Sequence, residues 1–182
     1  LKLVITNTNK RRGLADSKYN ERRAECEKAV KCFKKKLDIK QLADIDPKTF
    51  EKYKYLCDDN TILKRATHVV YEIDRTKNAV DKLKHGDVQA FGKLMNESHI
   101  SLRDLYEVTG IELDTLAEEA WKVDGVIGSR MTGAGFGGCT VSIVKDGAVE
   151  EFKRSVAKNY KKRVGLDAEF YIADIGSGAC EI

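Results

Sequence analysis

The sequence lacks the long apolar segments that would place a chain in a membrane. No stretch of its 182 residues stays apolar over the ~20 residues that a membrane-spanning helix needs. No signal peptide is recognisable at the first residues either. We therefore expect a cytoplasmic protein that does not interact with membranes.

Closely spaced cysteines and histidines are also missing. The five cysteines are an odd number and include no CxxC pair; they are Cys26, Cys32, Cys57, Cys139 and Cys180. Zinc sites need such close spacing of thiolates or imidazoles, so no metal site is expected in this chain. Free, mostly buried thiols are the simplest interpretation, in keeping with a cytoplasmic location.

No region of the chain concentrates charge of one sign. Lys and Arg total 33 and Asp and Glu total 29, which gives a net charge of +4. The short basic clusters, at residues 10–12, 34–36 and 161–163, fall at expected turns or helix ends, where lysines meet the helix dipole favourably. Nucleic-acid binders gather basic residues with exposed aromatics, so we expect no nucleic-acid partner.

Regular alternation of strands and helices is absent, which argues against a doubly wound parallel sheet. We expect strands at 1–6, 139–144 and 169–175, and helices from 17 to 37, after Pro47, and at 61–83, 88–95, 102–106, 112–122 and 149–164. Asp16 or Ser17, Asp87 and Ser101 are the expected N-caps, and Gly86 ends one helix. This order predicts an α+β fold, with helices on one face of a mainly antiparallel sheet. With no repeat or linker, residues 1–182 are interpreted as one domain.

Glycine is scarce along most of the chain but dense in one segment. Six of the 14 glycines lie between Gly125 and Gly138, just before the expected strand at 139–144. Such a run can present several backbone N–H groups to one anion, for example a phosphate. A tight glycine-rich hairpin without a ligand is an equally good explanation of the glycines alone.

Two familiar glycine motifs do not fit this segment. Gly133-x-Gly135-x-x-Gly138 matches the dinucleotide-binding string, but that motif opens a helix, and here a strand follows. The glycine loop of protein kinases would place valine where Thr140 stands, and no HRD or DFG motif follows.

The whole string GSRMTGAGFGGCTV, from Gly128 to Val141, resembles the third signature motif of the superfamily that includes galactokinase, homoserine kinase and mevalonate kinase. Further blocks, ITNTN, LADSKYNERRAECE, RATHV, LMNESHISL and ELD, resemble galactokinases in the same order. The resemblance is to the C-terminal half of a galactokinase and covers the whole chain. It implies the ferredoxin-like, mainly antiparallel C-terminal domain of the superfamily. Because the chain opens at Leu1 inside an apolar run, we expect an N-terminal half upstream.

The resemblance also implies site residues and ligands. Tyr19 matches the tyrosine that contacts the sugar; a tyrosine on the buried face of its helix is the alternative. The residues matching the loop beside the nucleotide phosphates are Gly133, Ala134, Gly135, Phe136, Gly137 and Gly138. Galactose, ATP and Mg²⁺ are the implied ligands of the complete enzyme. The catalytic Asp, its supporting Arg and the Ser-rich ATP loop belong to the N-terminal half, so no catalytic residue is assigned here. We expect the isolated chain to be inactive.

Other polar residues receive structural interpretations. Arg22 and Arg23 could be anion ligands, but ion pairs with neighbouring glutamates on the helix surface are favoured. His99 lacks an identifiable partner for base chemistry, so a place in a turn or cap is favoured. His68 is expected to be structural, and His85 to end a helix.

Three rival functions remain open at this stage. A kinase for a related sugar, such as an N-acetylated galactose, galacturonate or arabinose, would share these motifs. A sugar-sensing protein without turnover could be built on the same scaffold. An independent α+β module with no enzymatic role would have no upstream half at all.

Overall fold

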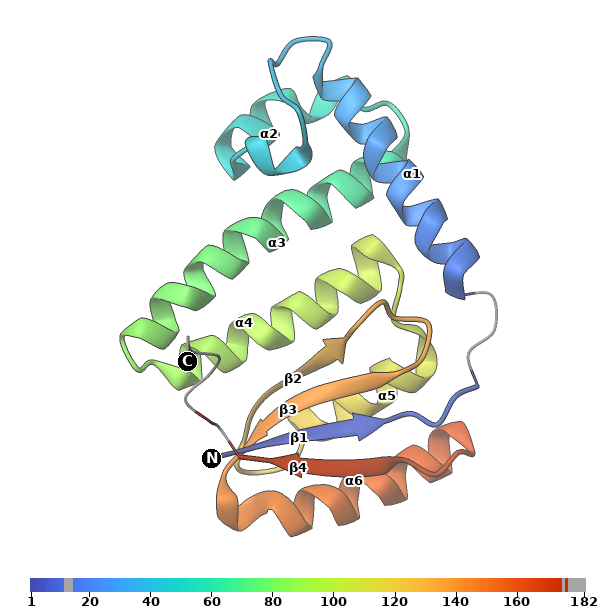
Figure 1. The fold of residues 1–182 in the computed structure, drawn as a ribbon, viewed down its shortest axis with the longest axis vertical. Helices are drawn as coiled ribbons and strands as arrows, with labels where there is room; N and C mark the ends of the chain where they lie inside the picture. Colours follow the sequence, from blue (N-terminus) through green and yellow to red (C-terminus); the bar gives the residue numbers. More distant parts are fainter. Residues whose placement is uncertain (12–14, 175, 177–182) are drawn as a thin grey trace, which may run out of the picture. The chain divides into compact units, whose positions relative to one another are not determined.

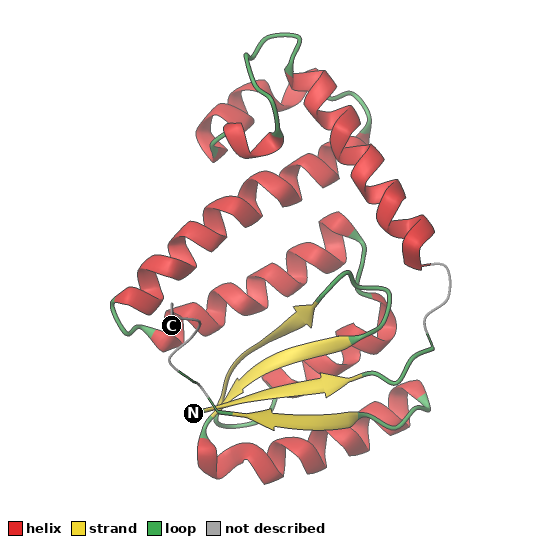
Figure 2. Cartoon of the chain, viewed as in Figure 1, coloured by secondary structure: helices red, strands yellow, loops and turns green. Residues whose placement is uncertain are grey.

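A computed structural model describes residues 1–11, 15–174 and 176 (Figures 1 and 2). Its contacts divide the chain into two compact units. Unit 1 consists of Leu1–Arg11 and Thr109–Ile182, and unit 2 of Arg12–Val108. A single kinase domain spanning 1–182 stays a prediction, and the two units are described separately below.

Unit 1 contains a four-stranded antiparallel sheet with strand order β2-β3-β1-β4. Its elements in chain order are β1 (Lys2–Asn7), α5 (Gly110–Trp121), β2 (Val126–Thr132), β3 (Cys139–Val144), α6 (Val149–Val164) and β4 (Glu169–Ala173), with a 3₁₀ turn η4 (Asp146–Ala148) before α6. This βαββαβ order and strand arrangement are those of a ferredoxin-like fold. The predicted α+β class and antiparallel sheet are confirmed.

Both helices of unit 1 pack on the same face of the sheet (Figure 1). On β1, Val4 and Thr6 are buried, whereas Leu3, Ile5 and Asn7 are only half-buried, as the alternation of side chains along a strand requires. Val4 joins one apolar cluster with Leu116 of α5 and Phe152 of α6. Burying side chains of this size stabilises the fold by about 1.5–3 kcal/mol each. This cluster therefore fixes the helical layer against the sheet.

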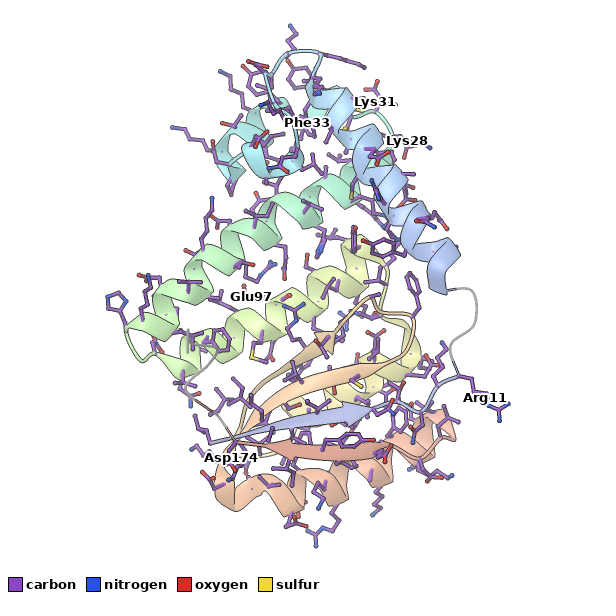
Figure 3. All side chains as sticks on the ribbon, viewed as in Figure 1. Arg11, Lys28, Lys31, Phe33, Glu97 and Asp174 are labelled. Atoms are coloured by element: carbon purple, nitrogen blue, oxygen red, sulfur yellow. The ribbon has the colours of Figure 1, made fainter. Side chains whose placement is uncertain are left out.

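Unit 2 is helical and lies, in sequence, between β1 and α5. Its helices are α1 (Ala15–Phe33), α2 (Pro47–Tyr53), α3 (Asn60–Lys84) and α4 (Val88–Ser101), with short turns η1 (Leu42–Asp44) and η2 (Lys54–Leu56) and a π-helical turn η3 (Leu102–Tyr106). Phe33 lies in its core, 5.6 Å from the Phe50 ring, whereas Lys28 and Lys31 stay exposed on α1 (Figure 3). No helix among the described residues is long and apolar enough to cross a membrane.

Short polar side chains begin three of these helices. Asp46, Asp59 and Asp87 each accept hydrogen bonds from backbone N–H groups of the following first turn. The predicted cap at Asp87 is confirmed by its 3.0 Å bond from Ala90 N. His85 ends α3 and Gly86 follows with a φ of +71°, as predicted.

Several expected element ends are wrong or lie elsewhere. α1 begins at Ala15, so Asp16 and Ser17 lie inside the helix, and it ends at Phe33 before Leu37. Ser101 does not cap a new helix: it is the last residue of α4, and the chain continues directly into η3 without a side-chain cap. The expected strand end at Ile175 lies outside the described residues.

The described cysteines are free, but fewer are buried than expected. Cys57 is buried, whereas Cys26, Cys32 and Cys139 are half-buried. Burial raises the pKa of the Cys57 thiol to about 12, so this thiol stays protonated near neutral pH. Cys180 lies outside the described residues.

Candidate functional site

The glycine-rich segment forms the loop of a hairpin between β2 and β3. Five of its six residues have φ in the left-handed region: Gly133 (84°), Gly135 (84°), Phe136 (57°), Gly137 (117°) and Gly138 (87°). Ala134 is exposed at the tip, whereas Gly135 and Gly137 are buried. The strand predicted at 139–144 is confirmed as β3. A loop that turns this tightly needs glycine at most of its positions.

Gly137 is the loop glycine that lies against Lys10. A Cβ there would lie 3.4 Å from Cδ and 3.5 Å from Cβ of Lys10. The Lys10 stem therefore lies against the loop backbone, and its Nζ forms a 2.9 Å ion pair with Oε2 of Glu112. Glu112 belongs to the first turn of α5, where a carboxylate meets the helix dipole favourably. One lysine thus connects the end of β1, the loop and α5.

Thr8 also fixes the loop, through its backbone. Its backbone N–H donates a 2.9 Å hydrogen bond to the carbonyl of Gly138. Its own carbonyl accepts a 2.8 Å hydrogen bond from the hydroxyl of Tyr160, which is completely buried at the end of α6. Burial, together with the nearby charge of Glu112, raises the pKa of Tyr160 to about 12. The phenol therefore remains a donor at neutral pH and fixes the backbone beside the loop.

Buried hydroxyls support the strands that lead into the loop. The side-chain oxygens of Ser129 and Ser142 lie 2.8 Å apart in a hydrogen bond between β2 and β3. The indole Nε1 of Trp121 donates a 3.0 Å bond to the carbonyl of Ser129. Ser129 therefore supports the structure of the hairpin.

The loop has the form of a possible anion site. Gly133 and Ala134 are exposed, so a ligand can reach the backbone at the tip. The hydrogen bond from Thr8 uses a carbonyl and occupies none of the loop's N–H groups. Among the described residues, no three His, Cys, Asp or Glu side chains gather into a cluster that could hold a metal ion. Phosphate contact by residues 133–138 stays a prediction.

Tyr19 belongs to unit 2 and lies in the second turn of α1. Its side chain is 57% exposed, which excludes the alternative of a tyrosine on the buried face of the helix. The core contacts of α1 come from later turns, through Ala29 and Phe33. Sugar contact by Tyr19 stays a prediction.

The two arginines that follow Tyr19 differ from each other. Arg23 forms an exposed pair with Glu27 at 3.2 Å across one helical turn, as predicted. Arg22 is only 7% exposed and bonds to backbone carbonyls as well as to glutamates. The predicted ion pairs of Arg22 with Glu21 and Glu25 are confirmed. Their expected place on the helix surface is wrong, because the guanidinium is buried within unit 2.

Two of the histidines, His68 and His99, are buried within unit 2. His68 is 5% exposed, with Nδ1 2.8 Å from Oγ of Ser101 and its ring stacked on Tyr106 at 4.5 Å. His99 is fully buried in the last turn of α4, so its expected place in a turn is wrong.

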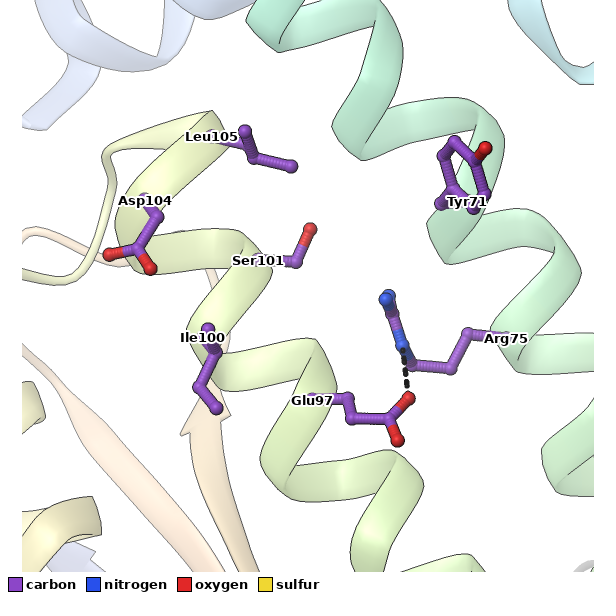
Figure 4. A pocket seen from close by; sticks show the side chains of 7 residues that line it. All are labelled: Tyr71, Arg75, Glu97, Ile100, Ser101, Asp104 and Leu105. Atoms are coloured by element: carbon purple, nitrogen blue, oxygen red, sulfur yellow. Dashed lines mark ion pairs between the residues drawn. The ribbon is translucent and has the colours of Figure 1, made fainter. Parts of the chain in front are cut away.

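A pocket of about 420 Å³ opens in unit 2 between α3 and the end of α4 (Figure 4). In Figure 4, Arg75 of α3 points toward Glu97 of α4, and the two form an ion pair at 3.6 Å. None of the predicted site residues lines this pocket.

Residues 79–162 match the sequence model of the family described as "GHMP kinases C terminal". The matched segment runs from the last turns of α3 to the last turn of α6. The chain is also 57% identical over 183 residues to a galactokinase of Fusobacterium nucleatum and 58% identical over 181 residues to one of Clostridium acetobutylicum. Each match covers 100% of this chain but only 47% and 46% of the relative, so the chain spans about half the length of these curated relatives.

Solved structures agree with this similarity. The Lactococcus lactis galactokinase complexed with galactose matches with a TM-score of 0.94 at 49% identity, over 100% of this chain and 47% of that one. The Methanococcus jannaschii mevalonate kinase matches with a TM-score of 0.51 at 19% identity, over 94% of this chain and 38% of that one, and shows the shared fold alone. The resemblance to galactokinases is confirmed.

Sequence reasoning missed the residues that hold the loop. Thr8 and Lys10 lie within or beside the ITNTN block, which drew attention only as a matching string. Their roles depend on β1 pairing with β3 in the register Asn7↔Cys139, which places them beside Gly137 and Gly138. No local pattern carries that information.

Proposed function

We propose that this chain is the C-terminal part of a galactokinase, which transfers the γ-phosphate of ATP to the 1-hydroxyl of galactose. The observation that carries the proposal is similarity over the whole chain to galactokinases, at 57% identity in sequence and a TM-score of 0.94 in structure. The matched structure is of an enzyme complexed with galactose.

In this proposal the loop at residues 133–138 lies beside the ATP phosphates. Its left-handed glycines allow a phosphate to approach the backbone without contact with side chains. Phosphoryl transfer depends chiefly on positioning and on neutralising charge, and a rigid hairpin supplies positioning. The bonds to Thr8 and the Lys10–Glu112 pair provide that rigidity.

Tyr19 supplies the sugar contact of this part of the enzyme. Its exposed ring can lie beside a pyranose while its hydroxyl hydrogen bonds to the sugar. In this proposal the catalytic base and most of the ligands of Mg²⁺ come from the remainder of the protein. The metal would neutralise phosphate charge when bound. We place the enzyme in the cytoplasm.

The test is a sugar panel on the full-length protein and on its Tyr19→Phe variant. Galactose, N-acetylgalactosamine, galacturonate and arabinose are compared as acceptors in a coupled ADP assay. We expect galactose to give the highest kcat/KM, and Tyr19→Phe to raise the galactose KM by about tenfold through loss of a hydrogen bond to the sugar. Tyr55→Phe is the matched control, because Tyr55 is similarly exposed at 61% but lies in η2.

The outcomes separate the rival functions. Preference for another acceptor would assign the chain to a related sugar kinase. Galactose binding without ADP formation would indicate a sensor. An unchanged galactose KM in Tyr19→Phe would remove Tyr19 from the sugar site while leaving the kinase assignment intact.

A further inference from the structure

The described side chains from Lys18 to Glu25, in the N-terminal half of α1, are mostly exposed. Among the described side chains from Lys18 to Glu25, Arg22 is the only one that is buried, and Glu25 is half-buried. The apolar core reaches α1 from Cys26 onward, with Ala29 and Phe33 fully buried. The placement of the segment that carries Tyr19 therefore depends on a polar contact.

Arg22 makes that contact with all of its guanidinium nitrogens. Nε donates to the carbonyl of Tyr106 at 2.7 Å, and Nη2 donates to the carbonyl of Glu107 at 3.2 Å. Nη1 bonds to Glu25 at 3.0 Å and to Glu21 at 3.2 Å. The planar fork of arginine thus binds two successive carbonyls and two carboxylates in a fixed direction.

Arg65 of α3 completes the same cluster. Its Nε bonds to Oε2 of Glu25 at 2.7 Å, the carboxylate oxygen that also accepts from Arg22. Nη1 donates to the carbonyl of Leu105 at 2.6 Å, and Nη2 bonds to Glu107 at 2.8 Å. Arg65 is 2% exposed, and its charge is balanced by these two glutamates.

The carbonyls that the arginines bind belong to the end of a helix. Residues 105–107 close η3, and Glu107 adopts a left-handed φ of 56°. The last carbonyls of a helix have no partner within it, so they need donors from elsewhere. Arg22 and Arg65 supply those donors, and in doing so they join α1, α3 and the end of η3 through buried hydrogen bonds.

We propose that Arg22 is a positioning residue for the sugar-contacting Tyr19, and that Glu25 and Arg65 hold its guanidinium in place. Tyr19 precedes Arg22 by three residues, a spacing that puts both on one face of α1. Fixing Arg22 therefore fixes the direction in which α1 presents Tyr19. This inference rests on the proposed function, since it assigns a role within the galactose site.

The experiment replaces Arg22 by lysine in the full-length protein. Lysine keeps the charge but cannot bond two carbonyls and two carboxylates at once. We expect the galactose KM to rise about fivefold to tenfold, with kcat and the ATP KM within about twofold of the parent. Arg23→Lys is the matched control, because Arg23 is the next residue and makes only an exposed pair with Glu27. It should leave the galactose KM unchanged.

A double-mutant cycle distinguishes positioning from general loss of structure. Tyr19→Ala removes the contact that Arg22 is proposed to aim. In a Tyr19→Ala background, Arg22→Lys should change the galactose KM by less than about twofold, because its effect acts through the missing side chain. If Arg22→Lys gives too little folded protein, Glu25→Gln weakens the same cluster, and its rise in galactose KM should likewise disappear in the Tyr19→Ala background.

Two results would overturn the proposal while leaving the kinase assignment in place. One is a lowered melting temperature of Arg22→Lys or Glu25→Gln with an unchanged galactose KM, which would make the cluster merely structural. The other is an effect of Arg22→Lys on the galactose KM that is just as large in the Tyr19→Ala background as in the parent. A parent protein that does not phosphorylate galactose would instead overturn the proposed function, and this inference with it.

Discussion

Replacing Gly137 by alanine is the most specific perturbation of the loop that the structure offers. Gly137 has a φ of +117°, outside the conformations that residues with a Cβ readily adopt. The new Cβ would also lie 3.4 Å from Cδ of Lys10. The substitution therefore introduces backbone strain, while the contact with Lys10 stays at an ordinary van der Waals distance.

The expected magnitude follows from the backbone strain. Strain of this kind costs about 1–3 kcal/mol. At 3.4 Å the new methyl group makes an ordinary van der Waals contact with the Lys10 stem, so the 2.9 Å pair of Lys10 with Glu112 stays in place. We expect the free energy of unfolding to fall by about 1–3 kcal/mol. For a chain of this size, that lowers the melting temperature by roughly 2–12 °C.

Thermal unfolding followed by circular dichroism measures this change against two control variants. Gly133→Ala has a similar strain, at a φ of +84°, but no atom within 4 Å of its Cβ, so it should cost about 1–2 kcal/mol. Gly147→Ala has no left-handed φ and no contact, and should stay within about 0.5 kcal/mol of the parent. Equal melting temperatures for Gly137→Ala and Gly147→Ala would refute the reasoning about the loop.

Three further predictions concern the buried polar groups and the ligands. Tyr160→Phe should lower the free energy of unfolding by about 1–2 kcal/mol at pH 7, since the Thr8 carbonyl loses its donor. The pKa of Tyr160 in the folded protein, about 12, lies above its ordinary value of 10.0. The parent should therefore lose stability as the pH rises from the lower pKa to the higher one. Urea titrations across that pH range should show a smaller loss of stability in the Tyr160→Phe variant. Arg65→Ala should lower the free energy of unfolding by about 3 kcal/mol, since it removes buried hydrogen bonds to Glu25 and Leu105. Arg23→Ala, at an exposed position, should lower it by less than about 0.5 kcal/mol. Equal urea midpoints for the two variants would contradict a stabilising role of the buried cluster. The isolated chain should form no ADP and bind galactose and ATP weakly at best in calorimetry; a Kd below about 10 μM for either would show that the chain holds that site by itself.

Elements with a clear period and local end signals were predictable from the sequence. The spacing of Val149, Phe152, Val156 and Tyr160 predicts α6 with the bounds that the structure shows. The alternating strand after the glycines is β3, and Asp87 caps α4 as its residue type suggests. In each case the signal lies within a few neighbouring residues.

The end of α4 shows where such signals fail. Ser101 precedes an apolar run and looks like a cap, yet the chain passes directly into η3. That turn is held by Arg22 and Arg65, which lie about 80 and 40 residues away in the sequence, respectively. Because tertiary hydrogen bonds determine this backbone, local propensity could not predict it.

One part of the candidate site was likewise predictable from the sequence, and the other part was not. Residues 133–138 were identified from glycine density and a motif, and the hairpin form follows from the flanking strands. The contact of Lys10 with Gly137 depends on strand pairing between segments about 130 residues apart. Arg22 was misassigned to the surface because burial of a guanidinium needs partners that only the fold supplies.

Phosphorus NMR of the full-length protein's reaction mixture, with galactose and ATP, tests the central proposal most directly. The proposal predicts one equivalent of ADP for each galactose 1-phosphate, with the new phosphorus signal coupled to the anomeric proton. ADP formed without a phosphorylated sugar, or phosphate attached to any other hydroxyl of galactose, would contradict it.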